Sequence, residues 1–252
     1  AEQEGRFYMY FSAGVEDRDH RLRVAVADRP EGPFRYDGEV LTPHERFAID
    51  ASPFRDDDGQ WYLYYARDFL DGERVGTALV VDRMLDMETL EGRPRTVLRA
   101  SADWQLFQRG RSMYGAVHDW HTLEAPFVVH RDGRYYCFYS GGSWLEESYG
   151  VSYAVAETPL GPFVDIGKPL QCGEGFVNID PMSFDDPATG KRLLYWGSGF
   201  QAIKVQELAP DRLSFADGTS EPETTKPPGF TPPPDSRSTP PSPLVSDMPR
   251  GV

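Results

Sequence analysis

The chain has 252 residues, of which 39% are hydrophobic and 13% aromatic, so it is long enough to bury a sizeable core. Its formal net charge is −14, and its Lys and Arg residues form no cluster that could meet phosphates. This balance excludes a nucleic-acid binder, argues against anionic membranes and polyanionic sugars, and favours a neutral ligand. The two cysteines predict neither a disulfide framework nor a zinc site. The sequence shows no membrane span and no signal peptide, so it leaves the compartment and the oligomeric state open.

A repeated segment occurs four times along the chain. Each copy begins with a turn glycine and a polar residue and continues as a strand rich in aromatic or large apolar residues; the copies are 5–12, 59–66, 133–140 and 190–197. A second strand-like segment follows each copy, at 22–27, 75–81, 151–156 and 202–207. A repeat period near 50 residues with about four strands per unit is typical of propeller blades. The sequence therefore predicts an all-β fold of the β-propeller type, with about four blades visible.

A third segment precedes three of the four glycines and carries one acidic residue each time. These residues are Asp50, Glu124 and Asp180, which lie 9, 9 and 10 positions before their glycines. The first strand of a propeller blade lines the central axis, so we expect the three carboxyl groups to occupy equivalent positions and to converge there. The same count from Gly5 falls before residue 1, which predicts that the first blade lacks its inner strand in this chain.

Two other stretches differ from the repeats. Residues 88–117 form an insertion, which we expect to shape the mouth of the axial cleft, because long loops in compact domains are often binding loops. From residue 219 onward Pro, Ser and Thr dominate, which predicts a disordered tail over 219–252. The propeller domain is accordingly expected to cover residues 1–218.

Converging carboxyl groups suit the hydrolysis of a glycosidic bond. This reaction needs one carboxyl group that donates a proton to the leaving oxygen and a second that activates water or attacks directly. The first must stay protonated near neutral pH, and a third carboxylate beside it can raise its pKa. Three acidic residues around one axis could supply all three roles.

The segments around Asp50 and Glu124 resemble glycoside hydrolase family 43, over about residues 5–215 and most strongly over 45–165. Asp50 lies in Ile-Asp-Ala-Ser-Pro-Phe and resembles the family's pKa modulator, and Glu124 lies in Trp-His-Thr-Leu-Glu-Ala-Pro-Phe and resembles its general acid. The resemblance implies a five-bladed propeller that hydrolyses arabinose- or xylose-containing glycans with inversion. Inversion requires the acid and base carboxyl groups to lie about 6.5–9.5 Å apart.

The chain departs from the family pattern in two places. The family's general base is an Asp in an Asp-Pro pair on the first blade, and this segment is absent here. The last blade of the family usually carries a Gly-His-Asn segment near an axial metal or water, but residues 175–180 read Gly-Phe-Val-Asn-Ile-Asp. Asp180 is therefore a candidate substitute base or second modulator-like carboxylate, or its segment is a sign of rearranged blades; a plain Asp-Pro turn former is a further alternative. The chemistry requires no cofactor, and no residue pattern indicates an axial calcium ion.

Three further residues are candidates for substrate binding. Trp120 and His121 are expected to line the sugar subsite beside Glu124, because an aromatic face stacks on sugar C–H groups; core packing is an equal alternative for Trp120. Ser52 follows Asp50 closely and is expected to contact the same sugar. Asp56, Asp57 and Asp58 fit a solvated hairpin turn better than a calcium loop, so no metal-binding residue is predicted.

Two functions from different classes follow. The first is a glycosidase of the α-L-arabinofuranosidase or β-xylosidase type, whose substrate is a neutral oligo- or polysaccharide. The second is a catalytically incomplete propeller that binds carbohydrate or serves as an interaction module. Acidic residues at matched axial positions favour the enzyme, because a scaffold has no need of them. The missing base segment favours the binding module.

Overall fold

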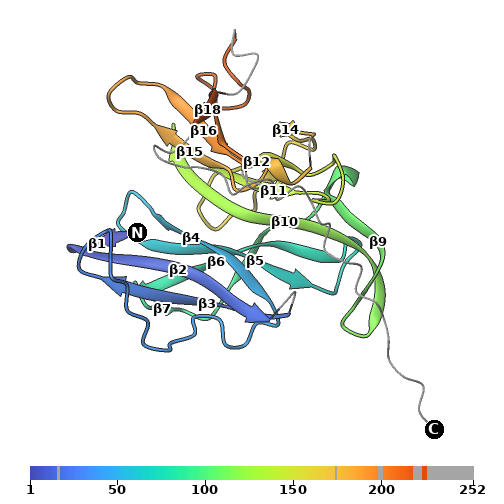
Figure 1. Ribbon diagram of the computed structural model, residues 1–252, viewed down its shortest axis with the longest axis horizontal. Helices are drawn as coiled ribbons and strands as arrows, with labels where there is room; N and C mark the ends of the chain where they lie inside the picture. The colour runs from blue at the N-terminus through green and yellow to red at the C-terminus, as the bar shows by residue number, and fades with distance from the viewer. Residues whose placement is uncertain (16–17, 174, 198–200, 218–222, 226–252) are drawn as a thin grey trace, which may run out of the picture.

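The computed structural model describes residues 1–15, 18–173, 175–197, 201–217 and 223–225. These residues are mostly β-strand and form three sheets (Figure 1). The described helices are two single 3₁₀ turns, η1 (Asp103–Gln105) and η2 (Gly175–Val177). None of the described helices is long and apolar enough to cross a membrane.

The first sheet has the order β1-β2-β3 and is formed by the blue strands in Figure 1. Its strands are β1 (Glu2–Gln3), β2 (Arg6–Val15) and β3 (Arg18–Ala27). β2 and β3 pair antiparallel along nearly their whole length, whereas β1 pairs with β2 at two positions only. The position beside β2 in this sheet is thus occupied by a two-residue strand.

The central sheet has eleven strands, and its main path is β13-β12-β11-β10-β6-β5-β4. β7 and β8 extend it beside β6, β9 beside β10, and β14 beside β12. The strands are β4 (Ala48–Arg55), β5 (Trp61–Phe69), β6 (Gly76–Asp86), β7 (Thr89–Leu90), β8 (Arg95–Leu98), β9 (Leu106–Met113), β10 (Ala116–Arg131), β11 (Arg134–Gly141), β12 (Gly150–Ala156), β13 (Val164–Asp165) and β14 (Gln171–Cys172).

This sheet consists of two antiparallel meanders that meet where β10 pairs with β6. The contact is parallel and covers two positions, His121 with Gly76 and Thr122 with Thr77. Gly76 has a φ of 143°, and a Cβ placed there would lie 1.9 Å from the carbonyl oxygen of His121. Only glycine permits this close approach, so Gly76 fixes the junction between the two meanders.

The third sheet has the order β15-β16-β17-β18 and lies at the opposite side of the molecule from β2 and β3 (Figure 1). Its strands are β15 (Met182–Asp185), β16 (Arg192–Trp196), β17 (Ile203–Glu207) and β18 (Glu223–Thr225). β18 lies within the segment 219–252 that the sequence predicted to be irregular. The rest of that segment, at 219–222 and 226–252, lies outside the described residues.

The core explains why the repeated strands are rich in aromatic residues. In β5, Tyr64 packs into a cluster with Tyr139 of β11, whereas its neighbour Tyr65 packs into another cluster with Tyr8 of β2. Successive side chains of a strand point to opposite faces, so each inner meander buries both of its faces against neighbours. β11 follows the same pattern, and its Phe138 packs with residues of the third sheet.

The predicted strands are confirmed. The four repeat segments form β2, β5, β11 and β16, and the strands that follow them form β3, β6, β12 and β17. The chain therefore has the all-β, propeller-type arrangement that the repeat predicted. The described sheets do not close into a ring, so the number of blades stays a prediction.

Candidate active site

Two of the predicted acidic residues, Asp50 and Glu124, lie where the inner strands β4 and β10 are interrupted by bulges, and Asp180 lies just before β15. In β4, Ile49 pairs with Ala66 and Ser52 with Tyr64, so Asp50 and Ala51 together oppose a single residue. Asp50 has a φ of 58°, in the left-handed region that non-glycine residues rarely adopt. Such bulges re-aim side chains and are frequent next to active sites.

A bulge of the same kind in β10 shows that Asp50, Glu124 and Asp180 do not all occupy the equivalent positions that the sequence had predicted. There Glu124 pairs with Ser140 and Phe127 with Phe138, so Ala125, with a φ of 51°, occupies the position that Asp50 holds in β4. Glu124 therefore lies one residue before that position. Asp180 has a φ of 53° and lies two residues before Met182, the first residue of β15 that pairs with β16. Asp50 likewise lies two residues before Ser52, where the pairing of β4 with β5 resumes. Asp50 and Asp180 are equivalent, and Glu124 is offset by one.

Asp50, Ala125 and Asp180 each have a positive φ, and the N–H group of each donates a hydrogen bond to an oxygen atom of the meander that precedes it in the chain. The N–H of Asp50 donates to Ser12 Oγ at 3.2 Å, and that of Asp180 donates to Ser140 Oγ at 3.0 Å. In the equivalent place before Ala125 the chain has Ala66, which has no hydroxyl group. The N–H of Ala125 instead donates to Asp50 Oδ2 at 3.0 Å. This bond holds the Asp50 carboxylate beside the strand that carries Glu124.

Ser140→Ala is expected to lower the free energy of unfolding by about 1–2 kcal/mol, because the N–H of Asp180 loses its acceptor. Ser140 is fully buried, so its hydroxyl is fixed toward that group. Urea unfolding measures the change, and Ser12→Ala removes the equivalent bond at Asp50 as a matched variant. Unchanged stability in both variants would show that these bonds do not hold the left-handed residues.

Glu124 is held in a mostly desolvated environment. Burial raises its pKa from 4.5 to about 8, and the negative charge of Asp50 is the second cause. Asp180 and Asp68 add smaller contributions in the same direction. The Tyr149 hydroxyl donates a hydrogen bond to Glu124 Oε1 and opposes the shift. Near neutral pH Glu124 therefore keeps its proton, as a general acid requires.

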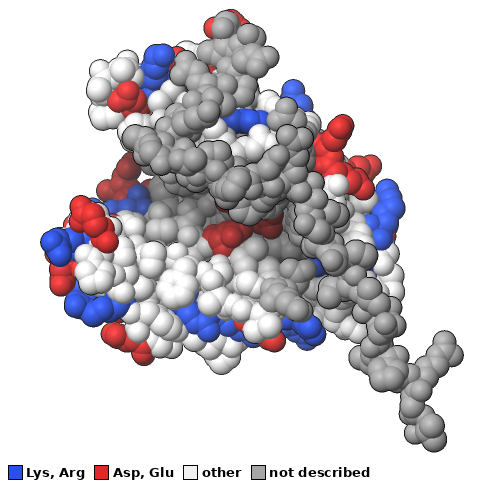
Figure 2. Space-filling model, in the orientation of Figure 1, with Lys and Arg blue, Asp and Glu red and all other residues white. Residues whose placement is uncertain are grey.

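Asp50 ionises before Glu124. Burial and the charge of Asp180 raise its pKa from 3.8 to about 6, and the hydrogen bond from the Ala125 N–H limits that rise. Partial desolvation also raises the pKa of Asp180, whose side chain is the most exposed of the three. The charges of Asp50 and Asp180 both raise the pKa of Glu124, and that of Asp180 also raises the pKa of Asp50, so the three carboxyl groups lie close enough to interact. Figure 2 shows a hollow in this face of the molecule with acidic side chains at its floor.

Tyr149→Phe is expected to raise the pKa of Glu124 further, because the hydrogen bond that stabilises its ionised form is lost. The alkaline limb of the kcat/KM profile then moves to higher pH, and kcat falls by about tenfold because Glu124 loses a positioning contact. The ring itself stays packed against Phe176 and Trp144. An alkaline limb that moves to lower pH would contradict this role of Tyr149.

A small cavity adjoins Glu124. It is lined by Phe47, Asp68, Thr77, Arg111, Met113, Trp120, Thr122, Glu124 and Trp144. Arg111 and Met113 come from β9, so the insertion at 88–117 does contribute to this cavity, as expected for a binding loop. The hydroxyl of Tyr114, at the tip of the β9–β10 hairpin, donates to Asp68 Oδ2 at 2.7 Å and ties the insertion to β5.

The three predicted substrate-binding residues are placed differently. Trp120 lines the cavity with Glu124, yet it is only 1% exposed and packs beneath the Arg111 guanidinium, so it also serves the core. His121 does not line the cavity: it alternates to the other face of β10, where Arg74 Nη1 lies 3.1 Å from its Nε2. Ser52 pairs with Tyr64 two residues beyond Asp50 in β4.

Among the described residues, one cluster has the composition of a metal site. Asp57 Oδ2 lies 2.9 Å from His130 Nδ1, and Asp56 completes the group. The cluster follows β4 and so lies at the opposite end of that strand from Asp50. The Tyr135 hydroxyl already donates to both carboxylate oxygens of Asp56, at 2.9 and 3.0 Å. We assign it no role in the chemistry of the site.

The residues present do not fit an axial metal held by the last blade. In the segment 175–180 the polar side chain before Asp180 is Asn178, which is buried and bonded within the protein. Asn178 Oδ1 accepts a hydrogen bond from Trp196 Nε1 at 3.0 Å, and its amide donates to the carbonyl of Gly173. This side chain is therefore occupied structurally, and no catalytic step is derived through a metal.

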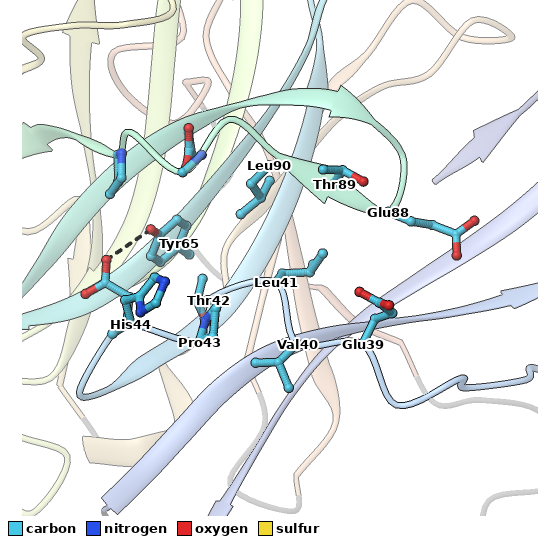
Figure 3. Close-up of a pocket in the computed structure, with 14 residues that line it drawn as sticks. Glu39, Val40, Leu41, Thr42, Pro43, His44, Tyr65, Glu88, Thr89 and Leu90 are labelled. Carbon is cyan, nitrogen blue, oxygen red and sulfur yellow. Dashed lines mark hydrogen bonds between the residues drawn. The ribbon is translucent and has the colours of Figure 1, made fainter.

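A larger hollow lies away from these carboxyl groups, between the 39–45 loop and the segment around β7 (Figure 3). Tyr65 forms part of its wall, and its hydroxyl donates to Glu45 Oε1 at 3.4 Å. The hollow contains none of the predicted site residues. The carboxyl groups at the bulges, rather than this hollow, define the candidate active site.

The sequence alone missed Tyr149 and Asp68. Both belong to strands or loops whose aromatic and acidic residues look like ordinary repeat positions, so no local signal distinguished them. A carboxyl group in an apolar strand requires a polar partner, and this requirement could have prompted a search for one. It could not have identified which tyrosine supplies it.

The chain is similar to known glycosidases over most of its length. The model of the family described as "Glycosyl hydrolases family 43" matches residues 1–165 and 125–229. The β-D-galactofuranosidase xynD of Aspergillus niger is 32% identical over 181 residues, which cover 70% of this chain and 45% of that protein. A β-xylosidase of Xylanibacter ruminicola is 31% identical over 190 residues, which cover 68% of this chain and 55% of that protein. The chain thus spans about half the length of these relatives.

Solved structures show the same fold. A thermostable family-43 glycoside hydrolase matches with a TM-score of 0.70 and 25% identity, over 92% of this chain and 76% of that one. An endo-arabinase from Bacteroides thetaiotaomicron matches with a TM-score of 0.67 and 20% identity, over 85% of this chain and 75% of that one.

Proposed function

Because this chain belongs to glycosyl hydrolases family 43, we propose that it hydrolyses glycosidic bonds in arabinose- or xylose-containing glycans by an inverting acid/base mechanism. Glu124 is the general acid and Asp50 is the modulator of its pKa. Asp180 is the candidate general base among the described residues. The observation that carries the proposal is the placement of Glu124 in a desolvated site beside Asp50, which keeps Glu124 protonated near neutral pH.

The proposed reaction uses each carboxyl group in one protonation state. Glu124 donates its proton to the glycosidic oxygen as the bond to the anomeric carbon breaks. Asp180, as the carboxylate, accepts a proton from a water molecule whose oxygen attacks the anomeric carbon from the opposite face. Asp50 stays ionised, so its charge disfavours ionisation of Glu124 before the reaction. The products are a free sugar of inverted configuration and the leaving alcohol.

The substrate class rests on charge and on the names of relatives. The net charge of −14 disfavours acidic glycans, so a neutral sugar is the better ligand. Relatives of the chain include a xylosidase/arabinosidase from Humicola insolens and an endo-α-(1→5)-L-arabinanase from Bacillus subtilis. These names support arabinose or xylose as the sugar released. They do not favour the alternative of a binding module without activity.

The proposal is tested with 4-nitrophenyl α-L-arabinofuranoside and 4-nitrophenyl β-D-xyloside. The corresponding 4-nitrophenyl β-D-galactofuranoside serves as a comparison, because one relative is a β-D-galactofuranosidase. We expect the chain to hydrolyse one of the first two and Asp180→Ala to lose that activity. Azide can take the place of the activated water, so we expect azide to restore turnover of Asp180→Ala with formation of a glycosyl azide. NMR of the first product is expected to show the inverted anomer.

Two results would contradict the proposal. If the folded chain hydrolyses neither pentoside, the proposed function is wrong. Full activity in Asp180→Ala would keep the function but assign the general base to another group.

A further inference from the structure

One polar side chain in the cavity beside Glu124 has no partner. Thr122 is 2% exposed, and its hydroxyl oxygen finds no hydrogen-bond partner among the described residues. It lies two residues before Glu124 in β10, so the two side chains point to the same face of the strand, and both line the cavity. A buried hydroxyl without a partner costs free energy, so a molecule that bonds it there is stabilising.

The neighbouring threonine shows how a hydroxyl in this wall can be satisfied by the protein. Thr77 pairs with Thr122 in the parallel register of β6 and β10 and lines the same cavity. Its hydroxyl donates to Asp68 Oδ1 at 2.8 Å, and Asp68 Oδ2 accepts the Tyr114 hydroxyl at 2.7 Å. These groups are occupied, so the open hydrogen-bonding capacity of this threonine pair belongs to Thr122.

The carboxyl group of Glu124 also has an available oxygen. The Tyr149 hydroxyl donates to Oε1, and no hydrogen bond from the described residues reaches Oε2. Residues two apart on a strand are separated by about 6.6 Å. A water molecule with two hydrogen bonds of about 2.8 Å spans most of that distance. One molecule in the cavity can therefore bond both Thr122 and Glu124.

The volume of the cavity decides which molecule fits. It is about 40 Å³, whereas pockets for organic ligands begin at about 300 Å³. A water molecule needs only about 10–15 Å³ and two to four polar partners. The cavity thus has room for water and none for a sugar ring. Its wall also contains Asp68 and Arg111, which carry opposite charges, so a neutral molecule suits it better than an ion.

We infer that a buried water molecule bridges the Thr122 hydroxyl and the Glu124 carboxyl group, and that Thr122 is a positioning residue for the general acid. This inference rests on the proposed function, in which Glu124 is that acid. Thr122 acts through the water and through Glu124, and it does not touch the substrate.

The bridge has a defined effect on the ionisation of Glu124. A water that donates a hydrogen bond to a carboxylate favours the ionised form, as the Tyr149 hydroxyl does. Burial and the neighbouring carboxylates act in the opposite direction. The water therefore limits the rise of the pKa, which keeps the acid strong enough to release its proton near neutral pH. The titratable and charged groups that surround Glu124 are Asp50, Asp68, Arg111, Tyr149 and Asp180.

The first test is a crystal structure of the chain that resolves ordered water. We expect a water within about 3.2 Å of both Thr122 Oγ1 and a carboxyl oxygen of Glu124. Thr122→Val keeps the shape of the side chain without its hydroxyl, so we expect this water to be lost. Thr122→Ser keeps the hydroxyl and is expected to retain the water. A dry cavity in the wild-type protein, or an unchanged water in Thr122→Val, would overturn the inference.

The second test measures the ionisation of Glu124 without any catalysis, by ¹³C NMR titration of its carboxyl group. We expect the midpoint to rise by about one pH unit in Thr122→Val, because the ionised form loses a hydrogen bond. Thr122→Ser is expected to keep the wild-type midpoint. Loosened packing would admit more solvent and lower the midpoint instead. An unchanged or lower midpoint in Thr122→Val would therefore contradict a bridge from Thr122 to Glu124.

The third test connects the water to the proposed reaction through the pH profile of kcat/KM. We expect the alkaline limb of Thr122→Val to move upward with the NMR midpoint, and kcat to fall about threefold, because a weaker acid transfers its proton more slowly. If the chain hydrolyses no glycoside but the water and the upward shift are observed, the proposed function fails and the bridge holds. If the wild-type chain is active and Thr122→Val has the wild-type profile, the inference fails alone.

Discussion

Glu124→Gln is expected to lower kcat/KM for a pentose disaccharide by about 10²–10⁴-fold, the contribution typical of a positioned general acid. The amide has the shape of the protonated carboxyl group but cannot release a proton to the leaving oxygen. Sugar alcohols are poor leaving groups and need that proton, whereas 4-nitrophenolate leaves without much assistance. The loss is therefore expected to be much smaller on the 4-nitrophenyl glycoside of the same sugar.

A larger loss on the disaccharide than on the aryl glycoside indicates that acid catalysis is lost, because general damage to the site would lower the activity on both substrates. Tyr149→Phe keeps the carboxyl group of Glu124 and serves as the control, with a similar loss of about tenfold expected on both substrates. Equal losses on both substrates in Glu124→Gln would assign Glu124 to another role.

Asp50→Asn is expected to move the alkaline limb of the kcat/KM profile to lower pH. The charge of Asp50 raises the pKa of Glu124, so removing that charge lowers it, and Glu124 then ionises at a pH where the wild-type residue is still protonated. At a fixed pH above the pKa of the wild-type residue, activity falls by about tenfold for each unit of the shift. Activity is expected to recover partly as the pH is lowered, which a misfolded variant would not show.

Asp68→Asn is the matched control for Asp50→Asn. Asp68 also faces the cavity beside Glu124 and raises its pKa, but it is the weakest of the causes. Its replacement is expected to move the same limb in the same direction by a smaller amount. An alkaline limb that stays in place in Asp50→Asn would exclude Asp50 as the modulator.

The strands could be predicted because each repeat contains a local signal for a turn followed by a signal for a strand. Turn glycines such as Gly59 and Gly133, both with positive φ, mark the hairpins, and the aromatic residues that follow bury both faces of a strand. The joining of two meanders into one sheet could not be predicted. It depends on Gly76 beside His121, two residues far apart in the sequence whose contact is set by the packing of β6 against β10.

The identity of the acidic residues was predictable, but their register was not. Counting from the turn glycines places Asp50 and Glu124 in the same position, since the spacing is equal. Both strands carry the same bulge, but the β4–β5 hairpin closes at Arg55 with Trp61 and the β10–β11 hairpin at Arg131 with Arg134. The shorter second turn shifts the register by one residue, so Ala125 rather than Glu124 corresponds to Asp50. This offset places the Asp50 carboxylate on the Ala125 N–H and beside Glu124, which is the arrangement that separates their pKa values.

The central claim is that Asp50 and a desolvated environment keep Glu124 protonated at neutral pH. The most direct test is a ¹³C NMR titration of the glutamate side-chain carboxyl groups, with the Glu124 signal assigned by its absence from Glu124→Gln. The account predicts a midpoint near 8 for this signal, and a lower midpoint in Asp50→Asn. A midpoint near 4.5 in the wild-type protein would contradict it, because Glu124 would then be ionised at neutral pH and could not serve as the acid.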